Sequence, residues 1–376
     1  NASLNKQYPT VKSFIDIRNA NPYALGLYTA DSFSFKTKAN IDLKNLDPVM
    51  LNAFVRLDST AVFKNRNTYR MDSLLLNGYM DSGKTIITML SAPADATLKG
   101  NYRYTELGSI FQQYLAKYTN TTLTNPPVTA YNIDVAVDVK PDPLYAVLIP
   151  GLFFDKNMSL RGRLDDSKTD SSRYLDISVP ALIYNGTHVA GLTAHAIDKG
   201  DSLRFTAVVD TVTVNPLQLY TTTLQGGLKN NRLSANFSTN DQNRKERYAF
   251  SITGSKQDDL YQVQLADKLK LNYDNWQVNG KNNILFGTRG INVEQFSISK
   301  GPEQIQVNSS NKALNAPLDV KINHFSLHNI TALYNTDSLH LDGYLNAAVR
   351  VADMSKNLPT LHGRIAVERL QTSRIR

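Results

Sequence analysis

The sequence contains no cysteine and a single tryptophan, Trp276, among its 376 residues. Without a thiol, the chain can form neither a disulfide nor a thiolate metal site. No apolar run approaches the roughly 20 residues that a membrane-spanning helix needs. The net charge of +8 comes from scattered lysines and arginines without a long basic run, which predicts a solvated surface and no nucleic-acid partner.

Side chains with metal-binding chemistry are also sparse. Six histidines occur in the chain. The close pair His324 and His328 would lie about 13 Å apart along a strand, which is too far to share a metal ion. We therefore predict neither a metal site nor a cofactor.

Alternation of apolar and polar residues dominates the sequence. Ile133, Val135 and Val137 alternate with polar or small residues, and the same period recurs after residues 203 and 339. Period two is typical of strands with one apolar face. Turn signals such as Asn185-Gly186 separate these strands at intervals of about 8 to 12 residues. The pattern predicts an all-β fold of repeated antiparallel strands.

Two segments interrupt the alternation. Residues 105–120, TELGSIFQQYLAKYTN, place their apolar side chains on one stripe at helical spacing, which predicts a helix. Residues 142–154, DPLYAVLIPGLFF, predict one or two helical turns that close an end of the sheet. A polar connector at 121–129 follows the first helix, so we divide the chain into two β-repeat regions, 1–120 and 130–376.

Gly78, Gly83, Lys84 and Thr85 match the phosphate-binding pattern G-x-x-x-x-G-K-[ST]. That loop works between a strand and a helix, whereas the β-branched residues after Lys84 favour extended backbone. We interpret the segment as a β-hairpin that turns at residues 81–84, and we expect no ATPase activity.

A second motif matches the nucleophile block of GDSL esterases at residues 200–203. A nucleophilic serine sits on a turn that opens a helix, whereas Ser202 enters the alternating strand LRFTAVVD. We therefore predict no catalytic residue and no enzymatic activity.

A short word, Leu-x-Gly, recurs along the chain. It occurs at Leu76-Gly78, Leu98-Gly100, Leu160-Gly162, Leu224-Gly226, Leu341-Gly343 and Leu361-Gly363. An inward glycine in a strand marks a close approach or a sharp bend. Bends at many successive strands predict an elongated, curved, U-shaped sheet that forms a groove.

Three stretches resemble the TamB family of cell-envelope proteins, within the AsmA-like group. They are residues 276–310 (WQVNGKNNILFGTRGINVEQFSISKGPEQIQVNSS), 318–351 (LDVKINHFSLHNITALYNTDSLHLDGYLNAAVRV) and 358–370 (LPTLHGRIAVERL). The resemblance implies a periplasmic β-groove that carries phospholipid and supports outer-membrane protein assembly. It also implies two attachments: an inner-membrane anchor, which we expect to lie outside this sequence, and an outer-membrane assembly barrel of the TamA or BamA type.

We expect the groove to be lined by the apolar positions of the alternating strands. These are Leu203, Phe205, Val209, Trp276, Val278, Leu339, Leu341, Leu345, Val349 and Val351. An open apolar groove would need acyl chains to fill it. The alternative is a secreted or surface β-sandwich array that binds glycan or protein, with its apolar faces packed on each other. Period two fits both alternatives.

Overall fold

The structure is a computed structural model of the chain. It describes residues 2–3, 8, 10–24, 33–47, 49–119, 129–166, 173–215, 217–257, 259–329, 340–354 and 358–373. Strands hold 71% of the residues and helices 7%, so the predicted all-β class of antiparallel strands with short helices is confirmed. The chain divides into two compact units, unit 1 (residues 1–117 and 121–200) and unit 2 (residues 118–120 and 201–376).

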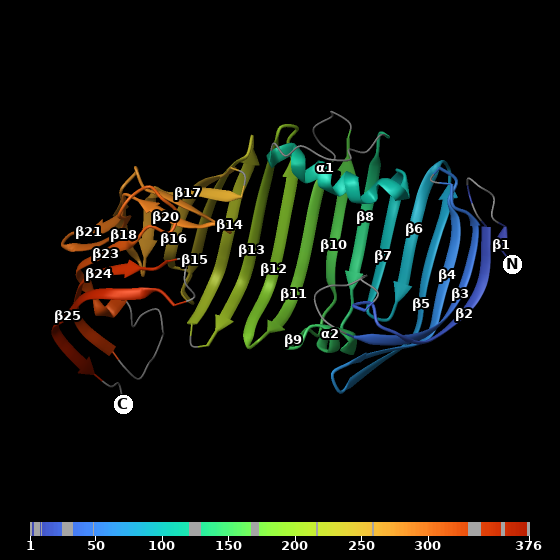
Figure 1. The fold of residues 1–376 in the computed structure, drawn as a ribbon, viewed down its shortest axis with the longest axis horizontal. Coiled ribbons are helices and arrows are strands. Elements are labelled where there is room, and N and C mark those ends of the chain that lie inside the picture. Colours follow the sequence, from blue (N-terminus) through green and yellow to red (C-terminus); the bar gives the residue numbers. More distant parts are fainter. Residues whose placement is uncertain are drawn as a thin grey trace. The chain divides into compact units, whose positions relative to one another are not determined.

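Unit 1 is built on an antiparallel sheet in which strands pair mostly in chain order (Figure 1). Its strands are β1 (Ala2–Ser3), β2 (Thr10–Ala20), β3 (Ser34–Asn45), β4 (Asn52–Lys64), β5 (Asn67–Asp81), β6 (Lys84–Ser91), β7 (Ala94–Asn101), β8 (Asn132–Val139), β9 (Leu152–Phe153), β10 (Met158–Asp165), β11 (Tyr174–Tyr184) and β12 (Thr187–Asp198). Each strand from β1 to β8 pairs with the next, and β8 continues through β10 and β11 to β12. The short β9 pairs with β11.

Two helices cover part of the apolar face of this sheet. A 3-10 turn, η1 (Tyr104–Glu106), leads into α1 (Leu107–Thr119), whose Ile110 is fully buried against β8 and β10. The shorter α2 (Pro143–Leu148) begins where the Asp142 carboxylate accepts the Leu144 N–H at 2.8 Å. Its apolar side chains pack on β4 and β5. The helix predicted for residues 105–120 and the helical turns predicted after residue 142 are both confirmed.

The predicted boundary at residues 121–129 falls inside unit 1. Residues 120–128 lie outside the described part of the chain. On either side of them, β7 pairs with β8 along its whole length, with Leu98 opposite Val135. Because the two flanking strands share one sheet, the two compact units divide at residue 200 instead.

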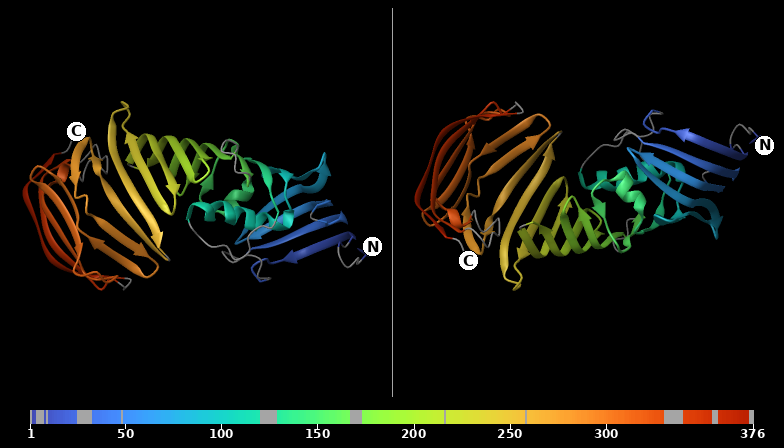
Figure 2. Two further views of the ribbon diagram at one scale, coloured as in Figure 1. Left: turned by 90° about the horizontal axis from the view of Figure 1, so that it is seen from above. Right: turned by 90° about the horizontal axis from the view of Figure 1, so that it is seen from below.

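Unit 2 continues the same pattern of consecutive antiparallel strands. They are β13 (Ser202–Val214), β14 (Leu217–Lys229), β15 (Arg232–Asn240), β16 (Glu246–Gln257), β17 (Leu260–Leu271), β18 (Asp274–Val278), β19 (Asn283–Gly287), β20 (Gly290–Glu294), β21 (Phe296–Lys300), β22 (Glu303–Ser309), β23 (Leu318–Ser326), β24 (His340–Ala352) and β25 (Thr360–Ser373). The first half of β17 pairs with β19 and its second half with β18, which then pairs with β21. The later strands, orange to red in Figure 2, follow a strongly curved path.

Bulges in unit 2 account for part of this curvature. The β14–β15 register shifts between Tyr220 and Thr223, and the β23–β24 register shifts between Ile322 and Phe325. Thr221 and His324, at these shifts, have φ of 45° and 48°. A bulge adds one residue to one strand and bends it, so the strands of unit 2 curve at these points.

The two enzyme-like motifs lie in ordinary β-structure. Asp81 pairs with Lys84, and Ser82 and Gly83 between them have φ of 50° and 77°. Two positive φ values are typical of a two-residue hairpin turn, so the predicted hairpin is confirmed. Ser202 is the first residue of β13, as the alternating pattern predicts.

Candidate functional site

The residues that the sequence predicts for the groove lie on one face of the sheet of unit 2. Leu203 pairs with Leu228, and Val349 with Val320. Directly paired residues point to the same side of a sheet. The observed register therefore places the apolar residues of neighbouring strands on one face. The predicted residues that lie on this face are Leu203, Phe205, Val209, Trp276, Val278, Leu341, Leu345, Val349 and Val351. Leu339 lies outside the described residues.

The middle of the apolar face is closed into a core. Trp276 is 3% exposed and is buried together with Leu269 and Ile298. Its ring lies 5.7 Å, centroid to centroid, from the ring of Phe325 on β23. Val278 packs at the edge of the same cluster. These two predicted groove residues therefore contribute to a packed core of unit 2, where the curved sheet brings distant strands together.

The carboxy-terminal part of the apolar face is open. Leu361, Ile365 and Val367 on β25 are 66%, 67% and 46% exposed. They pair with Val351, Ala347 and Leu345 on β24, so they extend the predicted stripe by one strand. Large exposed apolar patches are typical of interaction surfaces, which makes this strand the candidate site. The predicted groove residues include none from this strand, although its alternation is visible in LHGRIAVERL.

At the amino-terminal part of unit 2 the face is half-buried. Leu203, Phe205 and Val209 are each partly accessible, and Leu224 on β14 is 40% exposed. Phe205 faces Gly226 on β14, where a Cβ would lie 2.8 Å from the phenyl ring. The glycine therefore makes room for the aromatic ring, and the two strands present a smooth apolar surface.

Ion pairs lie on both faces of unit 2. Lys300 pairs with Asp274 and Glu303 beside the Trp276 ring on the apolar face, and other pairs lie on the opposite face. Arg350 lies 3.6 Å from Asp319 across β23 and β24. The Lys229 ammonium, 2.5 Å from Asp201, holds the pKa of that carboxyl below its ordinary value. Across the described residues, no group of three or more His, Asp or Glu side chains is placed to hold a metal ion. The apolar face thus offers contact area for apolar chains, and the ion pairs of Lys300 interrupt it beside Trp276.

Two helices cover part of the apolar face of unit 1, while Leu76 and Leu175 on the same face are 39% and 37% exposed. The α1 residues Ile110 and Tyr114 pack over Ile133 and Leu164. The α2 residues Leu144, Val147 and Leu148 pack over a second cluster on β4 and β5. The same alternating strands are therefore packed under helices in unit 1, whereas the described part of unit 2 has no helix of this length over its apolar face. Of the helices in the described ranges, none has the length and hydropathy to span a membrane.

Comparisons of the chain with protein-family models, with curated proteins and with solved structures found no match. The resemblance to the TamB family rests on the order and density of the Leu-x-Gly strands and on the quoted sequence stretches, together with residues 68–107.

Proposed function

We propose that this chain is a periplasmic segment of a TamB-like envelope protein, and that its apolar face carries phospholipid acyl chains between the inner and outer membranes. The observation that carries the proposal is the exposed apolar stripe of β25, where Leu361, Ile365 and Val367 continue the half-buried stripe of β24. A sheet face of this composition is stabilised when apolar chains cover it.

The energetics favour a ligand that binds and also slides. Each buried methylene contributes about 0.8 kcal/mol, so a partly covered acyl chain of several methylenes is held usefully. Consecutive positions on the face are chemically alike, because paired valine, leucine and isoleucine residues repeat across β22 to β25. An acyl chain can therefore move along the stripe without losing its contacts.

The partners follow from the resemblance alone. We propose an outer-membrane assembly barrel of the TamA or BamA type as one partner, and the inner membrane, reached through an anchor outside this sequence, as the other. Support of outer-membrane assembly belongs to the same proposal.

Lipid binding can be tested with a charge placed on either face of one strand. Leu345 lies half-buried on the apolar face of β24, and Ala348 lies exposed on the opposite face. After incubation with phospholipid vesicles, native mass spectrometry should detect bound lipid on the parent protein and on Ala348→Asp, but much less on Leu345→Asp. Thermal unfolding of both variants checks that each is folded. If no lipid is bound to the parent protein under these conditions, the proposal is wrong.

A further inference from the structure

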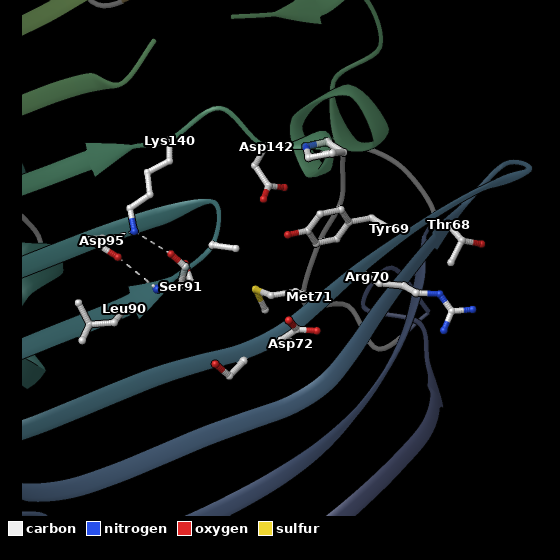
Figure 3. A pocket seen from close by; sticks show the side chains of 13 residues that line it. Thr68, Tyr69, Arg70, Met71, Asp72, Leu90, Ser91, Asp95, Lys140 and Asp142 are labelled. Carbon is white, nitrogen blue, oxygen red and sulfur yellow. Dashed lines mark hydrogen bonds and ion pairs between the residues drawn. The ribbon is translucent and has the colours of Figure 1, made fainter. Parts of the chain in front are cut away.

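Unit 1 contains a pocket where its sheet is incomplete. β6 pairs with β5 only from Leu74 to Asp81, so in the described structure residues 67–73 of β5 pair with β4 alone. The β6–β7 turn and the segment before α2 lie across from this free edge. A pocket of about 710 Å³ lies between them, lined by residues 68–73, Leu90, Ser91, Lys140 and Asp142, among others (Figure 3).

Tyr69 lies at the back of this pocket, with its hydroxyl beside the Asp142 carboxylate (Figure 3). Its side chain is 5% exposed and its ring packs with Val62 and Met71. Among the described residues, no hydrogen bond of normal geometry reaches its hydroxyl, which points into the pocket on the side of Asp142 (Figure 3). Burial, and then the nearby Asp142 carboxylate, raises the pKa of Tyr69 above its ordinary range. A phenol that donates to a neighbouring carboxylate keeps its oxygen as an acceptor, so the Tyr69 hydroxyl can still receive an N–H from a ligand.

Negative charge is in excess around that hydroxyl. Within the described part of the chain, neither Asp72 nor Asp142 forms an ion pair. Lys140 is already engaged, 2.7 Å from Asp95 and 3.0 Å from the Ser91 carbonyl oxygen. The Arg70 side chain points away from the pocket in Figure 3. Among the described residues, no group of three or more His, Asp or Glu side chains is placed to hold a metal ion.

We propose that this pocket binds a primary ammonium group, specifically the ethanolamine headgroup of a phospholipid, an inference that rests on the proposed function. An ammonium has three N–H donors and no acceptor. The Asp142 carboxylate and the hydroxyl oxygen of Tyr69 are the matching acceptors, and the exposed Asp72 carboxylate, on the opposite face of β5, adds negative charge at the free edge. Met71 and Leu90 also line the pocket, and they provide apolar contact for the part of the lipid next to the headgroup.

Three phospholipids with identical acyl chains test the headgroup preference by native mass spectrometry. We expect the parent protein to bind phosphatidylethanolamine about tenfold more tightly than phosphatidylglycerol, which has no ammonium, or phosphatidylcholine, whose quaternary ammonium has no N–H. The double variant Asp72→Asn/Asp142→Asn should bind all three equally. Asparagine keeps the N-cap of α2, so the fold should persist. Asp210→Asn, which neutralises an exposed carboxylate on β13, should keep the preference.

Calorimetric titration with free phosphoethanolamine separates the ammonium site from lipid binding. Phosphoethanolamine that binds the parent but not the double variant, together with lipids that fail to bind, would support the ammonium site and overturn its lipid source. Equal binding of the three lipids to the parent and the double variant would overturn this inference and leave the proposed function standing. Failure of every ligand to bind the parent would overturn both.

Discussion

At the scale of single residues, the glycines of the Leu-x-Gly words set how closely neighbouring strands approach. A Cβ added at Gly78 would lie 2.6 Å from a methyl carbon of Leu51, and one at Gly363 would lie 2.2 Å from the Ala348 carbonyl oxygen. Both distances are shorter than van der Waals contact. Most of these glycines thus occupy positions with little room for a side chain, whereas a Cβ at Gly162 would lie 3.1 Å from its nearest atoms.

Gly226→Ala should therefore lower the free energy of unfolding by about 1–3 kcal/mol, the usual cost of overpacking. Its new Cβ would lie 2.1 Å from the Ser234 carbonyl oxygen and against the ring of Phe205. The neighbouring Gly227 is the control, because its Cβ would meet only the Leu203 carbonyl oxygen, at 3.3 Å. Urea unfolding measures both variants. Equal losses of stability would show that the contact with Phe205 and Ser234 does not matter.

Lys84 is an exposed residue at the end of a hairpin turn. Lys84→Ala should change the free energy of unfolding by no more than about 0.5 kcal/mol, and calorimetric titration should detect no saturable ATP binding to the parent protein. Magnesium-dependent ATP binding that disappears in Lys84→Ala would contradict the hairpin interpretation of residues 78–85.

At the scale of elements, the packing of α1 depends on buried tyrosines. Burial raises the pKa of Tyr102 to about 12, and burial followed by the Asp166 carboxylate raises the pKa of Tyr131 to about 12. Both residues belong to the cluster around Ile110 of α1. Because ionised tyrosine is disfavoured in this cluster, α1 should be fully stable only while both phenols are neutral.

Raising the pH should therefore destabilise unit 1. The folded-state pKa values lie above the ordinary value of 10.0, so the stabilisation is complete below pH 10 and is lost as the pH rises from 10 towards 12. Hydrogen exchange of the α1 amides across this range measures the effect. Replacing Tyr102 and Tyr131 by phenylalanine should remove much of the alkaline loss, and an unchanged pH profile in that variant would contradict the assignment.

Local patterns predicted the elements well. The hairpin at residues 81–84 and helix α1 follow from neighbouring residues, because turn propensity and helical periodicity act over a few positions. The closed core around Trp276 does not follow from alternation, because a strand has period two whether its apolar face is open or covered. Its contact with Phe325 depends on bulges and on strands far along the chain. The pocket at Tyr69 likewise depends on the residue at which β6 ends. Strand propensity does not determine that residue.

At the scale of the whole molecule, the same alternating strand pattern gives apolar faces that are covered to different degrees. In unit 1 the helices α1 and α2 cover part of the face. In unit 2 the middle is packed around Trp276, and the face of β25 stays exposed. The proposed lipid path therefore depends most on β25. Among the described residues, no neighbour buries the apolar side chains of this strand as Trp276 is buried.

Site-specific photo-crosslinking on β25 tests lipid binding by this face most directly. Ile365 is 67% exposed on the apolar face, and Arg364 is exposed on the opposite face of the same strand. With a photoreactive residue at each position in turn and phospholipid vesicles present, we expect lipid adducts from position 365 and few from position 364. Mass spectrometry of the adducts identifies the acyl chains. Absence of lipid adducts at position 365, or equal yields at both positions, would contradict the account.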